Sequence, residues 1–301
     1  LKMTIWRVTI GRRIGRAGPA VASSSTPPTS PVAVTASDRP ALHSSSRRGA
    51  AGCPTMFNLF GSFFSRMSSC CSSREKADGL FLRPPGVKVV NYGVLGNSDH
   101  QPNVGANAAP PDASVAFVDP AGMHHIQNTK DGPRGASGAS GAIYHWLGIG
   151  SWSRFPDPVR ETITAPLLAK LHVYDSAGGV KINCIHCVGP DFREYPNCTQ
   201  AEAVDKLSQA YKNIFVQFCD SGLKRLRLLP MSGGVFSGQW SQDMVAFSRI
   251  TAEAVEKGFL ALPPEQQARV EESKLEMCIF MQSQVELFAS AFRVPNDRPK
   301  L

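Results

Sequence analysis

From Val87 onward, short runs of β-branched and apolar residues alternate with segments of helical periodicity, and this alternation constrains the fold most strongly. In the clearest helical segment, residues 201–219, apolar residues recur at steps of three and four, as on the buried face of a helix. Strands that alternate with helices make a mainly parallel or mixed sheet that helices cover on both faces. The sequence therefore predicts one α/β domain over residues 81–301.

The expected elements follow from these runs. The strands are expected at 87–92, 114–118, 180–188, 226–229 and 275–280. Helices are expected to start at Ala142 and to cover 201–219, 241–259 and 285–292. Residues 262–273 are polar and contain prolines, so they are expected to be a loop.

The first part of the chain has a different composition. Residues 1–74 contain ten Lys or Arg and one acidic residue, so this part carries about nine positive charges. Since the whole chain has a formal charge of +8, the rest is near −1 and offers no basic surface for nucleic acid. Residues 1–55 are rich in Arg, Ser, Ala and Pro and cannot bury enough apolar surface to fold. We expect residues 1–80 to be a disordered or targeting tail and linker.

The first sixteen residues, LKMTIWRVTIGRRIGR, combine arginines with apolar residues and contain no acid. This composition is typical of a mitochondrial transit peptide. The alternatives are a basic tail that carries no targeting signal and upstream sequence that is not normally translated. A mitochondrial location is therefore expected, or a cytoplasmic one if translation starts at Met56. No apolar run in the chain approaches the roughly 18–20 residues that span a bilayer.

Two loops rich in glycine and small residues each follow a strand and precede a helix. They read GASGASGAIY at 135–144 and LPMSGGVFSG at 229–238. Small residues let the backbone approach a ligand closely, and the amides at a helix N-terminus attract anions. Two such loops that face each other are suited to clasp a diphosphate. Neither loop matches the P-loop, because Gly-Lys-Ser/Thr is absent, and neither is a GxGxxG followed by an acid about 20 residues later.

The order and spacing of four segments resemble the macrodomain family over about residues 85–295. The segments are FVDPAG at 117–122, GASGASGAIY at 135–144, CIHCVGP at 184–190 and LPMSGGVFSG at 229–238. They are similar to the family's strand ending in NAAN, its loop of the form GGGGVDGAIH, its strand IIHTVGP and its loop PAISTGIFG. The resemblance implies a three-layer α/β/α macrodomain with a central mixed, mainly parallel sheet. It also implies a cleft for ADP-ribose, either free or linked to proteins, in a monomer that needs no cofactor or metal.

The resemblance also implies which residues line this cleft. Backbone amides of residues 138–143 and 232–236 would hold the diphosphate, and Phe236 would cover the ribose or the diphosphate. Phe280 or Met281 would pack on the adenine. The full predicted set is Gly122, Gly138, Ala139, Ser140, Gly141, Ala142, Ile143, Ser232, Gly233, Gly234, Val235, Phe236, Phe280 and Met281.

This chain departs from the family pattern at positions that carry chemistry. The ribose-facing Asn falls on Gly122, and the Asp that helps to activate water in hydrolytic members falls on Ser140. Tyr144 stands where the family has a histidine, Ser237 replaces a glycine, and the early Gly-Asp-Ile motif that reads the adenine is not clear. We therefore expect an ADP-ribose-binding protein with weak or absent hydrolase activity. The alternatives are an active ADP-ribosyl hydrolase or O-acetyl-ADP-ribose deacetylase, and a degenerate macrodomain that serves as an interaction scaffold.

Two groups of cysteines and histidines have the appearance of functional sites. Cys184 and Cys187 flank His186 with the spacing of a redox or zinc motif, but residues three apart in a strand point to opposite faces. We therefore expect core thiols and a structural His186. The adjacent His124 and His125 are expected to be loop residues close to the ribose end of the cleft. The alternative is that they replace the missing catalytic groups.

Overall fold

The computed structural model describes residues 81–294 apart from residues 129, 177 and 178. The tail and targeting predictions for residues 1–80 lie outside this part of the chain. Within it, a six-stranded sheet has the order β2-β7-β6-β3-β5-β4. The strands span Lys88–Val90 (β2), Lys274–Cys278 (β7), Arg225–Leu228 (β6), Val115–Asp119 (β3), Lys181–Cys187 (β5) and Ala169–Asp175 (β4).

Five of these strands are parallel to their neighbours, and only β4 runs antiparallel, against β5. The predicted mixed, mainly parallel sheet is therefore confirmed. A separate antiparallel pair joins β1 (Phe81–Leu82) to β8 (Arg293–Val294) and brings the two ends of the described chain together.

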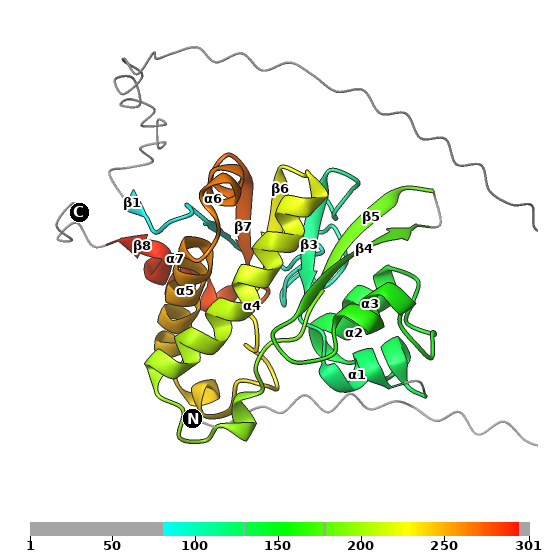
Figure 1. Ribbon diagram of the computed structural model, residues 1–301, viewed down its shortest axis with the longest axis horizontal. Coiled ribbons are helices and arrows are strands. Elements are labelled where there is room, and N and C mark those ends of the chain that lie inside the picture. Colours follow the sequence, from blue (N-terminus) through cyan, green and yellow to red (C-terminus); the bar gives the residue numbers. More distant parts are fainter. Residues whose placement is uncertain (1–80, 129, 177–178, 295–301) are drawn as a thin grey trace, which may run out of the picture. The chain divides into compact units, whose positions relative to one another are not determined.

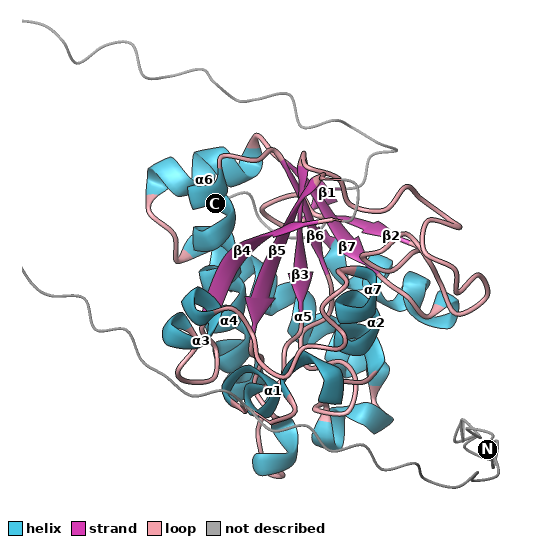
Figure 2. Cartoon of the chain, turned by 90° about the vertical axis from the view of Figure 1, so that its right-hand side faces the viewer, coloured by secondary structure: helices cyan, strands magenta, loops and turns pink. Residues whose placement is uncertain are grey.

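Helices cover both faces of the sheet, which gives three layers (Figure 1, Figure 2). One layer consists of α4 (Gln200–Ser221), α5 (Met244–Leu260), α6 (Pro264–Glu271) and α7 (Val285–Phe292). The other consists of α1 (Met123–Gln127), α2 (Gly138–Trp146) and α3 (Asp157–Thr162). Short 3-10 turns lie at Gly132–Gly135, Phe192–Glu194, Gly238–Gln242 and Gln282–Gln284.

The strand residues alternate between the two cores that these layers enclose. In β3, Ala116 and Val118 pack with α4 and α5, whereas Phe117 packs with α2 on the opposite face. Cys184 and Cys187 likewise lie in different cores, so the two thiols of the apparent motif cannot act together. Burial raises the pKa of both thiols well above its ordinary value, as expected for inert core cysteines.

Several local expectations were wrong. Residues 264–271 form a helix rather than a loop, because proline is compatible with a first helical turn and Val270 supplies a buried anchor. The helix expected to begin at Ala142 begins at Gly138 instead, so much of the first glycine-rich segment is helical. His124 and His125 belong to the short helix α1 and not to a loop.

A buried arginine fixes the long segment that follows β2. The guanidinium of Arg227 donates to the carbonyl oxygens of Val94 (2.9 Å) and Ala109 (2.9 Å) and to Glu276 (3.2 Å). It also lies over the ring of Tyr92, 5.2 Å from the ring centroid. Because a buried cation needs all of these partners, residues 92–109 are held against the sheet without forming a helix.

Close packing between α4 and α5 depends on Gly258. A Cβ atom at this position would lie 2.7 Å from the carbonyl oxygen of Ser208 and 2.9 Å from the amide nitrogen of Lys212. Both contacts are with backbone, so a side-chain rotation cannot relieve them. The absence of a side chain at Gly258 therefore sets the distance between the two longest helices.

We predict that Gly258→Ala destabilises the protein by about 1–3 kcal/mol, because the two helices must move apart. Intrinsic helix propensity alone would favour alanine by about 1 kcal/mol, so the sign of the effect separates packing from propensity. Urea unfolding of the full chain measures it. Gly234→Ala is the control, since a Cβ there meets nothing within 4 Å, and it should change stability by less than about 0.5 kcal/mol. A stabilised Gly258→Ala variant would contradict this account.

Candidate ligand-binding site

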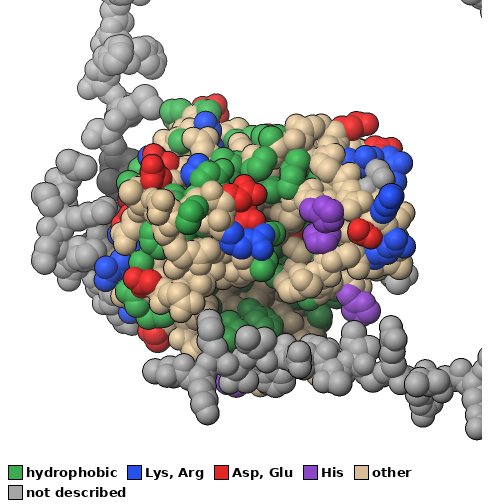
Figure 3. Space-filling view, turned by 90° about the horizontal axis from the view of Figure 1, so that it is seen from below, with side chains coloured by type: hydrophobic (Ala, Val, Ile, Leu, Met, Phe, Trp, Pro, Cys, Tyr) green, Lys and Arg blue, Asp and Glu red, His purple; other side chains and the backbone are tan. Residues whose placement is uncertain are grey.

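Four loops meet at the carboxyl edge of the parallel strands, where α/β sheets bind ligands. They follow β3, β5, β6 and β7, and Figure 3 looks onto this edge from below the view of Figure 1. The loops after β5 and β6 are joined directly. The amide of Phe192 donates to the carbonyl oxygen of Phe236 (2.9 Å), and the hydroxyl of Ser232 donates to that of Pro190 (2.6 Å).

The first predicted loop supplies the N-terminus of α2. The side chain of its N-cap residue, Ser137, makes no capping hydrogen bond, and the first backbone bond is from the amide of Gly141 to the carbonyl oxygen of Ser137 (3.2 Å). The amides of residues 138–140 are thus orphan donors of the first helical turn. Gly138, with φ of 61°, Ala139 and Ala142 are exposed. This end of α2 offers the kind of donors that bind anions.

Two members of the first set do not offer their side chains to a ligand. Ile143 is buried in the core between α2 and the sheet. The hydroxyl of Ser140 is buried and donates to the carbonyl oxygen of Pro120 (3.1 Å), which ties α2 to the end of β3. Ser140 therefore fixes the position of the loop and is not placed to activate water.

The second predicted loop is held in shape from beneath. The hydroxyl of Tyr211 donates to the carbonyl oxygen of Leu229 (3.0 Å) and accepts from the amide of Met231 (3.1 Å). Ser232 has a φ of 60°, which is unusual for a residue with a side chain. Gly233 is packed closely against Pro230 and Phe247.

The outer part of this loop is open. Gly234 is exposed, and a Cβ there would meet nothing within 4 Å. The side chain of Val235 is 70% exposed, while Phe236 is half-buried. Ser237 is buried and closes the turn, because its hydroxyl and its amide both donate to the carbonyl oxygen of Gly234 (2.8 and 3.1 Å).

Gly122 brings the end of β3 to this second loop. It caps α1, and a Cβ on it would lie 3.7 Å from Cζ of Phe236 and 3.3 Å from Cδ2 of His125. The guanidinium of Arg193, from the loop after β5, lies over the ring of Phe236, 5.0 Å from its centroid. Gly122 and Phe236 thus lie side by side.

Phe280 and Met281 follow the end of β7 and are 41% and 42% exposed. Phe280 packs against Gly93, and its carbonyl oxygen accepts from the amide of Asp99 (3.1 Å). The carboxylate of Asp99 in turn accepts from the amide of Gln282 (3.0 Å). Asp99 is therefore an acid beside the two exposed apolar residues.

A buried hydrogen-bonded network underlies the end of β3. Asp119 is fully buried, and its Oδ2 accepts from the hydroxyl of Tyr144 (2.6 Å) and from Nδ1 of His186 (2.7 Å). Nε2 of His186 pairs with the hydroxyl of Tyr174 (2.8 Å). Burial, and then the Asp119 carboxylate, raise the pKa of Tyr144, so its hydroxyl remains a donor. His186 is therefore a structural residue, as expected, and Tyr144 holds α2 against β3.

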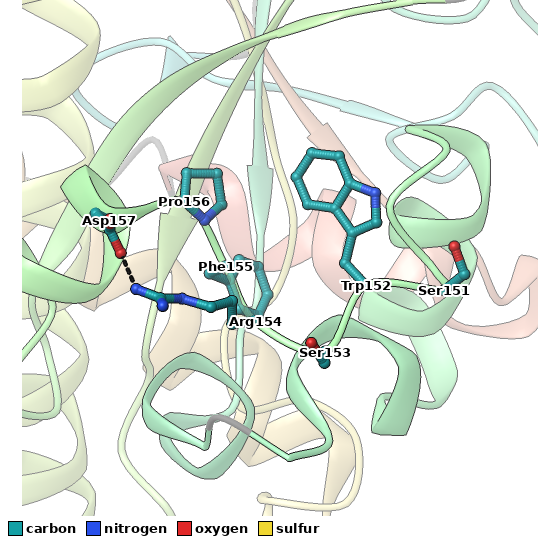
Figure 4. A pocket seen from close by; sticks show the side chains of 7 residues that line it. All are labelled: Ser151, Trp152, Ser153, Arg154, Phe155, Pro156 and Asp157. Atoms are coloured by element: carbon teal, nitrogen blue, oxygen red, sulfur yellow. Dashed lines mark hydrogen bonds and ion pairs between the residues drawn. The ribbon is translucent and has the colours of Figure 1, made fainter. Parts of the chain in front are cut away.

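Two cavities in the described part of the chain lie elsewhere. One, of about 610 Å³, is lined by residues 151–157, including Trp152, Phe155 and an ion pair between Arg154 and Asp157 (Figure 4). The other, of about 410 Å³, lies against β2 and β7 and is lined in part by Tyr92 and Glu276. Neither is lined by the predicted ligand residues.

No cluster of His, Cys, Asp or Glu among the described residues is able to hold a metal ion. Among the same residues, no helix is both long and apolar enough to cross a bilayer.

Comparison with known proteins gave solved structures alone, since no protein-family model and no curated protein matches the chain. The Oceanobacillus iheyensis macrodomain with ADP is 12% identical, with a TM-score of 0.44, and the match covers 70% of this chain and 94% of that one. The Trypanosoma brucei macrodomain in complex with ADP-ribose is 16% identical, with a TM-score of 0.39 and coverage of 69% and 73%. A chain described as alphavirus P23pro-zbd is 18% identical, with a TM-score of 0.38 and coverage of 62% and 24%.

The structures that this chain resembles thus include macrodomains, which is the family that its motif order predicted. The fold class rests on the sheet order and the two helical layers, which the chain itself displays.

We predict that Tyr144→Phe destabilises the protein by about 1–3 kcal/mol, because the buried Asp119 carboxylate loses one of its two donors. Urea unfolding at pH 7 measures the change. Tyr195→Phe is the matched control, because that ring is 39% exposed, and it should stay within about 0.5 kcal/mol of the wild type. Equal stabilities for wild type and Tyr144→Phe would show that the network does not hold this edge together.

Proposed function

We propose that this chain is a divergent macrodomain that binds ADP-ribose, free or attached to proteins, at the carboxyl edge of its sheet. The observation that carries the proposal is the pairing of two backbone features at one edge. The orphan amides of residues 138–140 lie at the N-terminus of α2, and the open Gly234 lies on the loop after β6. Phosphate oxygens accept several hydrogen bonds at once, and bonds to charged acceptors are stronger than neutral ones.

The rest of the edge suits the other parts of such a ligand. Phe280 and Met281 offer exposed apolar surface on one side, with the carboxylate of Asp99 beside them, as a purine with an exocyclic amine requires. Phe236 and Gly122 lie together on the other side of the second loop. The proposal therefore places the adenine near β7, the diphosphate between the loops after β3 and β6, and the second ribose near Gly122.

Binding, rather than turnover, is the activity that we assign to the edge. Glycine at position 122 has no side chain to orient a sugar, and the Ser140 hydroxyl is already bonded to the backbone of Pro120. A hydroxyl is also a poor base at neutral pH, whereas a positioned general base contributes about 10²–10⁴-fold. Backbone amides provide the diphosphate contacts regardless of these side chains, so binding survives where hydrolysis does not.

We predict that Gly234→Glu weakens ADP-ribose binding at least about tenfold, a loss of roughly 1.4 kcal/mol or more, because the new carboxylate fills the open space and repels the diphosphate. Isothermal titration calorimetry of the full chain measures this. The side chain meets no protein atom near its Cβ, so the unfolding midpoint should match that of the wild type. A Gly234→Glu variant that is folded and retains wild-type affinity would remove this loop from the site.

We also predict that release of ADP-ribose from proteins modified on acidic side chains is at least about 100-fold slower than with an active hydrolase, the factor that a general base supplies. The measurement is single-turnover release from a labelled substrate. Turnover comparable with an active hydrolase would overturn the assignment as a binder, and its loss in His124→Ala or His125→Ala would name the base.

A further inference from the structure

The strand β2 forms one edge of the six-stranded sheet, where it pairs with β7 alone (Figure 2). The carbonyl oxygen of Val90 accepts from the amide of Ile279 (3.1 Å), and successive residues of a strand turn their backbone groups to opposite sides. The amide and the carbonyl oxygen of Val89 therefore point away from β7, and no hydrogen bond to them is formed within the part of the chain that the structure describes. Such an unpaired edge is a template for another extended segment.

An open cavity of about 410 Å³ follows this edge. It is lined by residues 88–92, which include β2, by Lys274 and Glu276 of β7, and by Val285 of α7. Its volume lies in the range of roughly 300–1,000 Å³ that is usual for ligand pockets. The two valines of β2 are only half-buried, whereas every residue of the central strand β3 is buried. The edge therefore has room and apolar surface for one more strand.

The two faces of this edge differ in chemistry, because side chains alternate along a strand. Val89 and Val285 pack against the core on the face that α5 and α7 cover. Lys88 precedes Val89, and Lys274 precedes Leu275, which belongs to the same core. Both lysines therefore lie on the opposite face of the sheet. One face of the edge is apolar, and the other carries two ammonium groups.

The second face has more positive charge than its acid can neutralise. Glu276 is the one carboxylate among the described residues that line the cavity, and it already pairs with Lys274 (2.7 Å) and Arg227 (3.2 Å). Lys88 is exposed and has no ion-pair partner among the described residues. Burial, and then Glu276, raise the pKa of Tyr92 to about 12, so this hydroxyl stays uncharged at pH 7. Three cations against one carboxylate leave two positive charges beside the free edge.

From this geometry we propose that the edge of β2 binds an extended segment of a partner protein in which acidic and apolar residues alternate. The segment pairs with the backbone of Val89, turns its apolar side chains toward Val285 and its carboxylates toward Lys88 and Lys274. Strand addition takes its affinity from main-chain hydrogen bonds and its specificity from alternate side chains. The inference does not depend on the proposed function, because none of these residues belongs to the proposed ADP-ribose site.

A second copy of this chain fits the edge less well than an acidic partner. If two copies paired edge to edge, the lysines of one β2 edge would approach those of the other. Like charges across a strand pair are destabilising, and lysines on an edge strand discourage pairing between identical edges. The charge of the edge therefore favours a segment of opposite sign.

The test titrates three short blocked peptides into the full chain in a calorimeter at pH 7. The first peptide alternates Glu and Val, the second has Lys in place of every Glu, and the third is the first with its backbone amides methylated. The titrations are made with the wild type, with Lys88→Glu and with Lys181→Glu. Lys181, which is 62% exposed on β5, is the matched control, because its replacement makes the same change in charge three strands away from β2.

We expect the Glu/Val peptide to bind the wild type saturably, with one peptide per chain. Methylation of its backbone and Lys88→Glu should each weaken binding at least about tenfold, the value of one or two net hydrogen bonds or of one close charge pair. Lys181→Glu should retain the wild-type affinity, and the Lys/Val peptide should give no saturable heat.

Several results would overturn the inference. One is a folded wild-type protein that does not bind the Glu/Val peptide. Equal affinity for the methylated peptide would show charge attraction without strand pairing, and equal losses in Lys88→Glu and Lys181→Glu would show attraction to no particular edge. A wild-type dimer in sedimentation that becomes a monomer in Lys88→Glu would assign the edge to a second copy instead.

Discussion

The buried carboxylate of Asp119 is the interaction on which the proposed ligand-binding edge depends. It ends β3 and accepts hydrogen bonds from Tyr144 of α2 and from His186 of β5, so three elements meet at one oxygen atom. Water cannot replace these donors, because Asp119 and His186 are fully buried. A buried carboxylate is tolerated only when it is paired, and here the pairing also fixes where α2 begins relative to β3. The positions of Gly122 and of the orphan amides in α2 follow from this arrangement.

Small residues then decide how near a ligand can come. Gly234 leaves the backbone exposed on the loop after β6, whereas Gly122, at the end of β3, is buried against His125 and Phe236. The loop after β6 keeps its shape because Tyr211 hydrogen-bonds to its backbone, and because its own Ser232 hydroxyl donates to Pro190 in the loop after β5. The edge therefore combines rigid support with open backbone, which is the combination that allows main-chain amides to bind an anion without reorganising.

Much of the fold could be predicted from the sequence, because strong periodicity reports burial directly. The strands at β3, β5, β6 and β7 and the helices α4, α5 and α7 stand close to their expected places. The sequence patterns of α6 and β4 are weaker, and they did not predict these two elements. The helix α6 is short and polar, with Val270 as its buried anchor, and β4 lies at the edge of the sheet, where it pairs with β5 alone.

Of the predicted site residues, Gly122 and Phe236 lie side by side, whereas the side chain of Ile143 and the hydroxyl of Ser140 are buried. Sequence could not show the position of Asp99, because it depends on contacts with Phe280 and Gln282, which are far away in the chain.

The central claim is that this edge of the sheet binds ADP-ribose through its backbone, and one titration tests it most directly. ADP-ribose is titrated into the folded full chain in a calorimeter at neutral pH, with its folded state checked by thermal unfolding of the same sample. The account predicts saturable binding with one ligand per chain. A folded protein that gives no saturable heat, and whose unfolding temperature does not rise with added ADP-ribose, would contradict it.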